Sequence, residues 1–356
     1  MYKDIIEQIK TGLTGDPETD IKYLQKKITE YEDHEDRDRI AGACGQLIYD
    51  LLPDSVKEEF SSLNEALRLG IDEYSTEAAK LLREGKEAEA FGKLEDGIAL
   101  LEGSDVYNEK DGVPYYDFRR PMEEAIFKDR YGFEKKIKLV PEPVVGLYRM
   151  YAGILYDRKE HVKAMEYLDK AFKWNPYHQC TTIEYADNLR EMGRLEDFRE
   201  KLYETFTFAY EPEALAKCYR RLAWYFSEKK EWEPAAVCIL LAERFEGYKR
   251  SLMQVEKPGP EKGENRNDGS DGILQQEKSY ILENAGEEFG KLSADDIGCI
   301  ACKNEIPPGP DLEIVTLASN VAEEFEEAGN SAAAKYFYGI VYGLTGDGMA
   351  GEKAAK

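Results

Sequence analysis

The sequence is poor in histidine, with only His34, His161 and His178 among its 356 residues. None of the three lies near a serine or cysteine in the pattern typical of an activated nucleophile. The histidines therefore support neither a catalytic triad nor a metal cluster. We predict a non-catalytic protein that holds no cofactor and no metal.

Positive charge is scarce as well, because 48 lysines and arginines face 72 aspartates and glutamates, a formal net charge of -24. A chain this acidic repels the phosphates of nucleic acids and the headgroups of anionic membranes. We therefore predict no nucleic-acid or membrane partner. The hydrophobic fraction of 42% and the 24 tyrosines still supply enough apolar surface for a folded protein, unlike an acidic disordered one.

Long apolar runs are absent from the sequence. No stretch of 18 apolar residues occurs, so we predict no membrane-spanning helix. The N-terminal residues lack the apolar run and cleavage site of a signal peptide, which favours a cytoplasmic protein. Most of the six cysteines fall within helical apolar patterns, and we interpret them as reduced thiols of the core. They are Cys44, Cys180, Cys218, Cys238, Cys299 and Cys302.

A pattern of small and large residues begins at Tyr148 and predicts a pair of antiparallel helices. Two helices approach closely only where a small side chain meets a large one, so Ala152 and Ala164 allow the pair to interlock. Pro176 then ends the second helix, because proline cannot continue it. The positions that carry the pattern are Tyr148, Tyr151, Ala152, Leu155, Ala164, Leu168, Ala171 and Pro176.

The same register recurs along the chain. Ala186 follows Ala152 by 34 residues, and the equivalent alanine of the next copy follows 37 residues later. The second copy departs from the pattern at Phe198, where a small residue is expected. Residues 74–94 and 322–338 keep the small-residue spacing and form two outlying copies. A recurring unit of this length predicts a repeat protein.

These spacings resemble the tetratricopeptide repeat. Residues 115–118, 173–176 and 218–222 add a likeness to a group of tetratricopeptide proteins common in Firmicutes, which covers roughly residues 70–345. The resemblance implies an all-α fold, an α-α superhelix built as a solenoid of antiparallel helix pairs. It implies no particular activity.

The sequence predicts four parts, and no strand in any of them. Residues 1–70 are helical without the repeat motif and are expected to cap the solenoid. The repeat array spans residues 71–250, with an aromatic-rich insertion at residues 105–144. Residues 256–272 hold turn-forming and charged residues and are expected to form a flexible linker. Residues 273–356 complete the chain with a further helical pair.

Cys299 and Cys302 have the spacing of a metal or redox motif. A zinc site needs a second pair of ligands, and no other cysteine or histidine lies within 50 residues of them. The pair falls within a helix predicted from Ala294 to about Asn304 and capped by Ser293. We interpret both cysteines as small apolar fillers on one face of this helix.

The resemblance also indicates where a partner would bind, because the first helices of tetratricopeptide pairs line a concave wall. Carried onto this chain, the wall consists of Arg149, Tyr156, Asp187, Arg190, Lys217, Arg220 and Trp224. Arginine and aromatic residues are common anchors of interfaces, and such a groove accepts an extended or helical peptide. An alternative is that Tyr156 and Trp224 pack between repeats.

The wall therefore predicts a non-catalytic scaffold or adaptor that binds a protein or a peptide. It does not match the chaperone-tail binders of the family, because Gly146, Met150 and Asp157 stand where those proteins carry a carboxylate clamp. A peptide-sensing regulator is one alternative, and a helical hydrolase or phosphatase is another. The insertion concentrates aromatic and positive residues, and it is expected either to pack across the groove or to meet a partner.

Overall fold

The computed structural model describes residues 2–31, 34, 37–52, 68–109, 112–132, 134–256 and 270–355. The predicted all-α superhelical fold is confirmed, since helices dominate and neighbouring helices pack against each other. The chain divides into two compact units, Met1–Arg68 with Glu324–Ser331, and Leu69–Glu323 with Ala332–Lys356. No helix of the described residues is both long enough and apolar enough to cross a bilayer.

The first unit contains the helices α1 (Tyr2–Thr11), α2 (Pro17–Glu30) and α3 (Arg37–Leu51). The carboxylate of Asp20 is buried, and it accepts hydrogen bonds from the backbone N–H groups of Thr14 and Gly15 at 2.7 and 2.9 Å. These bonds fix the turn between α1 and α2. The core of the unit consists of Ile6, Ile9, Leu24, Ile40 and Cys44.

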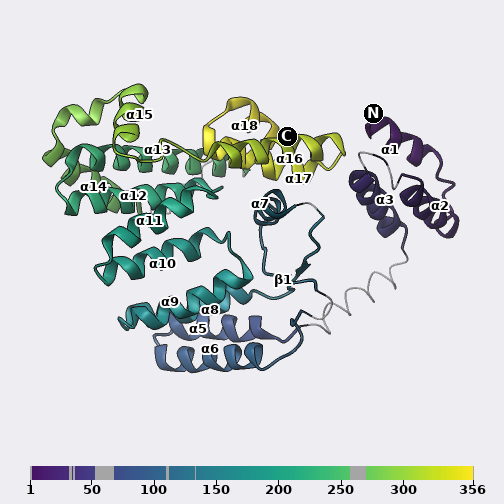
Figure 1. Ribbon diagram of the computed structural model, residues 1–356, viewed down its shortest axis with the longest axis horizontal. Helices are drawn as coiled ribbons and strands as arrows, with labels where there is room; N and C mark the ends of the chain where they lie inside the picture. Colours follow the sequence, from purple (N-terminus) through teal and green to yellow (C-terminus); the bar gives the residue numbers. More distant parts are fainter. Residues whose placement is uncertain are drawn as a thin grey trace. The chain divides into compact units, whose positions relative to one another are not determined.

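The second unit is a stack of helix pairs. Each pair packs against the next in chain order, as contacts of α6 with α8, α9 with α10 and α11 with α12 show (Figure 1). The pairs are α5 (Ile71–Arg83) with α6 (Glu87–Glu102), α8 (Val144–Asp157) with α9 (His161–Trp174), α10 (Gln179–Glu191) with α11 (Leu195–Phe206), and α12 (Pro212–Glu228) with α13 (Trp232–Glu256).

Small residues lie where the helices of this unit meet. Ala152 is 2% exposed, and Ala164 and Ala186 are fully buried, so these positions allow close packing as the sequence predicts. Phe198, which breaks the small-residue pattern, is fully buried too and packs edge-on against Trp224 with ring centroids 5.8 Å apart. A large side chain therefore fills the interior of the degenerate copy.

The remaining elements follow α13, and all of them belong to the second unit except residues 324–331. The predicted linker at residues 256–272 falls mostly on residues 257–269, which lie outside the described residues, while Ser270 already belongs to the next helix. Ser293 caps α15 through a capping box with Asp296, as predicted. The elements are α14 (Ser270–Ala285), a 3-10 helix (Glu287–Lys291), α15 (Ala294–Lys303), α16 (Leu312–Glu327), α17 (Ser331–Thr345) and α18 (Gly348–Ala355).

The insertion corrects the expectation that the chain has no strands. Strands β1 (Tyr115–Tyr116) and β2 (Lys138–Leu139) pair in parallel on either side of α7 (Pro121–Tyr131). The insertion lies against loops of the array, since Arg130 donates to the carbonyl of Thr207 at 2.7 Å and Tyr210 donates to Glu123 at 3.1 Å. Arg130 also lies over the ring of Tyr177, just before α10, so the insertion packs beside the starts of α10 and α12.

The cysteines divide into two groups. Cys44, Cys218 and Cys238 are buried as predicted, and Cys180 is partly buried. The interpretation of Cys299 and Cys302 as apolar fillers is wrong, because both are exposed. Their helix α15 buries Ile297 and Ala301 instead. Within the described part of the chain, no group of three or more histidine, cysteine, aspartate or glutamate side chains is placed to hold a metal.

Candidate functional site

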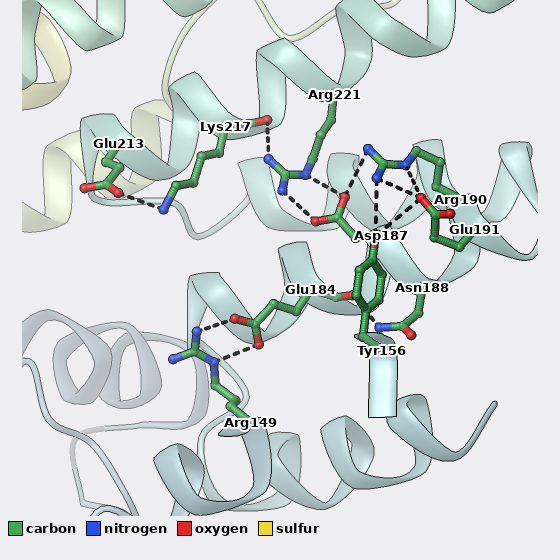
Figure 2. Close-up of polar contacts among 10 residues, drawn as sticks. All are labelled: Arg149, Tyr156, Glu184, Asp187, Asn188, Arg190, Glu191, Glu213, Lys217 and Arg221. Carbon is green, nitrogen blue, oxygen red and sulfur yellow. Dashed lines mark hydrogen bonds and ion pairs between the residues drawn. The ribbon is translucent and has the colours of Figure 1, made fainter. Parts of the chain in front are cut away.

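The first helices α8, α10 and α12 are linked by ion pairs between successive repeats. Arg149 of α8 forms a bidentate pair with Glu184 of α10, and its Nε lies 2.9 Å from Glu184 Oε2 (Figure 2). One repeat further on, Asp187 of α10 accepts two hydrogen bonds from Arg221 of α12, at 2.8 and 2.5 Å. Bidentate geometry makes these the strong form of ion pair.

Two aromatic side chains, Tyr156 and Trp224, contact Arg190 beside Asp187. Arg190 is 3.5 Å from Asp187 and 3.0 Å from Glu191, and its guanidinium carbon lies 5.3 Å from the ring centroid of Trp224. Tyr156 donates to Glu191 at 3.3 Å. Both predicted aromatic residues of the wall therefore contact side chains of the neighbouring repeat, and both remain partly exposed.

The remaining wall residues also have partners. Lys217 lies 2.7 Å from Glu213, and Arg220 forms two hydrogen bonds of 2.9 Å with Glu277 of α14. Burial of Lys217 favours its neutral form, but the hydrogen bond and charge of Glu213 outweigh this and raise its pKa. The structure thus places all seven predicted residues on α8, α10 and α12, with each cation neutralised by a carboxylate of the chain.

A hollow of about 370 Å³ lies beside these ion pairs, a volume within the usual range of ligand pockets. Gly153 is exposed at its wall, and a methyl group added there would meet no atom within 4 Å. The apolar lining residues are Leu82, Met150, Ala152, Ile154 and Leu168 from α5, α8 and α9. The polar ones are Tyr156, Asp157, Glu184, Asp187 and Asn188 from α8 and α10.

The acids of the hollow are not equivalent. Glu184 and Asp187 are paired with arginines, and Asn188 donates to the carbonyl of Glu184 at 2.9 Å (Figure 2). Asp157 is exposed and forms no ion pair with any described residue. An apolar lining with one unpaired acid at the edge suits an apolar side chain that carries a donor or a positive charge nearby.

His178 and Cys180 lie at the start of α10, close to Arg149. The imidazole of His178 accepts a hydrogen bond from the Thr181 N–H, and burial, with Arg149 and Arg120 nearby, lowers its pKa to about 3. Burial raises the pKa of the Cys180 thiol. The histidine is therefore neutral and the thiol protonated at neutral pH, which is the opposite of an activated Cys–His pair.

The wall predicted from the sequence lacks several residues of this arrangement. Glu184, Arg221 and Gly153 line the hollow or pair across repeats, yet none belongs to the predicted set. The missed signal is a spacing of one repeat: Arg149 and Glu184 are 35 residues apart, and Asp187 and Arg221 are 34. Opposite charges at the repeat length on first helices indicate ion pairs between neighbouring repeats.

No protein-family profile matches the chain, and no curated protein matches its sequence.

Proposed function

We propose that this chain is a tetratricopeptide-type scaffold that binds a peptide segment of another protein across α8 and α10. The observation that carries the proposal is the hollow of about 370 Å³ with its apolar lining and polar edge. Its size suits one large apolar side chain of the bound peptide. The hollow is already present in the structure, so its formation needs no rearrangement of the backbone.

The arginines contribute to this site mainly as structural residues. Arg149 and Arg220 are each occupied by a carboxylate of the neighbouring first helix or of α14. A ligand carboxylate would have to displace these bidentate partners, and the exchange would gain little. Recognition through the hollow, with Asp157 at its edge, needs no such displacement.

The alternative of a hydrolase has less support. A nucleophilic mechanism needs a lowered thiol pKa or a histidine that accepts a proton near neutral pH. Burial instead lowers the pKa of His178 to about 3 and raises the pKa of the Cys180 thiol.

Filling the hollow tests the proposal directly. We expect peptides selected from a random-peptide phage library against the wild type to share an apolar residue. Their affinity should fall at least tenfold for Gly153→Leu, because the added side chain occupies the cavity. Replacement of a glycine within a helix also raises helix propensity by up to about 1 kcal/mol, so the variant should fold.

Gly298→Leu is the matched control. Gly298 lies within α15, away from the hollow, and a side chain there also has open space. This variant should bind the selected peptides as the wild type does. Peptides that bind both variants equally, or a selection that enriches no sequence, would contradict the proposal. Affinities are measured by isothermal titration after circular dichroism has established equal helicity.

A further inference from the structure

The end of α7 and the segment that follows it form a positively charged surface on an acidic protein. Residues 128–138 contain five lysines and arginines and two acidic residues, whereas the whole chain has 48 against 72. Arg130, Tyr131, Lys135, Lys136 and Leu139 are exposed there, and we call these five residues the insertion patch. Tyr131 is 56% exposed and Leu139 is 48% exposed.

The cations of the patch are not neutralised in the way that the cations of the wall are. Lys135 lies over two rings, with its Nζ 4.7 Å from the centroid of Tyr131 and 5.3 Å from that of Phe127. Arg130 stacks on Tyr177 at 5.2 Å and donates to a backbone carbonyl. Within the described part of the chain, Arg130, Lys135 and Lys136 form no ion pair with a carboxylate.

Ring contacts leave the positive charge available. A cation on an aromatic face gains about 0.5–1 kcal/mol at an exposed site and keeps its charge, whereas a carboxylate partner cancels it. Other cations that lie over rings, such as Lys93 and Lys229, also pair with a carboxylate, whereas Arg130 and Lys135 do not. The three cations outnumber the exposed acids of the same stretch, Asp129 and Glu134, so the patch is locally positive on an acidic protein.

Aromatic rings that pack at tilted angles form the base of the patch. Phe127 packs against Tyr131 at 4.8 Å and against Tyr116 at 4.7 Å between centroids. Leu139 is in register with Tyr116 in the parallel strand pair, so the two side chains share one face. Tyr131 and Leu139 thus offer exposed apolar surface beside the cations, and little side-chain entropy is lost when it is covered.

We propose that the insertion patch docks an acidic segment of a partner protein, whose carboxylates pair with Arg130, Lys135 and Lys136 and whose apolar side chains cover Tyr131 and Leu139. Charge complementarity selects this occupant. It also disfavours a nucleic acid, because a long polyanion extends beyond the patch on a chain with a net charge of -24, and its phosphates there come within the Debye length of about 8 Å of carboxylates. An acidic peptide is short enough to remain on the patch.

The experiment measures fluorescence anisotropy of the full-length protein with a labelled short peptide of alternating glutamate and leucine. We expect binding that weakens as salt rises, and at least a tenfold loss for Lys135→Glu/Lys136→Glu. Tyr131→Ala should weaken binding with little change in its salt dependence, because it removes apolar contact and no charge. The pocket variant Gly153→Leu should bind this peptide as the wild type does.

Lys26→Glu/Lys173→Glu is the matched control, since both lysines are exposed and the change in net charge is the same. It should leave binding nearly unchanged. An equal loss in the control would show that only overall charge matters and would overturn the proposal. So would single-stranded DNA or vesicles rich in phosphatidylserine that bind through the patch while the acidic peptide does not. Circular dichroism of each variant verifies its fold.

Discussion

At the scale of single residues, three buried carboxylates hold the insertion to the array. Glu142 accepts hydrogen bonds from the N–H groups of Leu69 and Ile71, where α5 begins. Asp117 accepts one from Val145 at 2.7 Å, in the first turn of α8. Each carboxylate meets N–H groups that a helix start leaves without a partner inside the helix, and the helix dipole favours its charge there.

Glu123 is the third of these carboxylates, and it gives a prediction for pH. Burial raises the pKa of Glu123 above its usual 4.5, although the N–H groups of Arg119 and Arg120 and the hydroxyl of Tyr210 donate to it. The folded state therefore holds this proton more tightly than the unfolded state. Its stabilising contribution is present below pH 4.5 and is lost as pH rises toward the folded pKa.

Glu123→Gln removes this titration. The free energy of unfolding of the wild type should exceed that of the variant most at low pH, and the difference should shrink as pH rises above 4.5. Urea unfolding at a series of pH values measures it. Asp129→Asn, at an exposed position of α7, is the control and should show no such trend. A difference that grows with pH would contradict the direction of the shift.

At the scale of elements, the turns inside the helix pairs share one backbone conformation. Gly85 and Gly193 have φ of +75° and +73°, in the left-handed region that glycine tolerates. Lys159 and Lys230 take the equivalent place in the other two pairs with φ of +63° and +60°. A lysine pays a steric penalty there, because its Cβ approaches the following carbonyl.

Lys230→Gly should relieve this strain and raise the free energy of unfolding by about 1 kcal/mol, the steric penalty minus the greater entropy of an unfolded glycine. Chemical denaturation monitored by circular dichroism measures the gain. Lys86→Gly is the control, since Lys86 has φ of -94° and glycine relieves nothing there. If both substitutions destabilise the protein equally, the turn stores no strain.

The sequence predicted the helix pairs because their pattern depends on local spacing, which residues such as Ala152, Ala164 and Ala186 display directly. It did not predict β1 and β2, since two-residue strands are too short to show a periodicity. It also missed the hollow, because an exposed glycine such as Gly153 has no side chain to mark a cavity. Cys299 and Cys302 of α15 were wrongly expected to be apolar fillers, because a cysteine can lie in a core or on a surface and its presence alone does not decide between them.

At the scale of the whole molecule, a stack of repeats owes its cooperativity to the interfaces between neighbours. Packing supplies most of that coupling. The ion pairs between first helices add electrostatic contacts that depend on the orientation of the two side chains. Asp187 and Arg221 are well placed for this role, because their side chains are only 15% and 23% exposed and meet through two hydrogen bonds. Loss of Asp187 leaves the charge of Arg221 partly buried and without its carboxylate, whereas loss of Arg221 leaves Asp187 with only the longer contact to Arg190 at 3.5 Å.

A double-mutant cycle tests that coupling. Asp187→Ala and Arg221→Ala should each destabilise the protein, and the cycle should yield an interaction energy of about 1 to 2 kcal/mol. Lys201 and Glu204 form a pair within α11, where Glu204 is mostly exposed, so their cycle should give below about 0.5 kcal/mol. Urea unfolding followed by circular dichroism and by tryptophan fluorescence gives both values.

The two signals should also separate in the Asp187→Ala variant, because weaker coupling allows neighbouring repeats to unfold at different denaturant concentrations. The Lys201→Ala/Glu204→Ala variant should keep them coincident. Coincident transitions in every variant, with a cycle energy near zero, would mean that packing alone joins the repeats. The opposite charges at the repeat spacing would then contribute to solubility and not to cohesion of the stack.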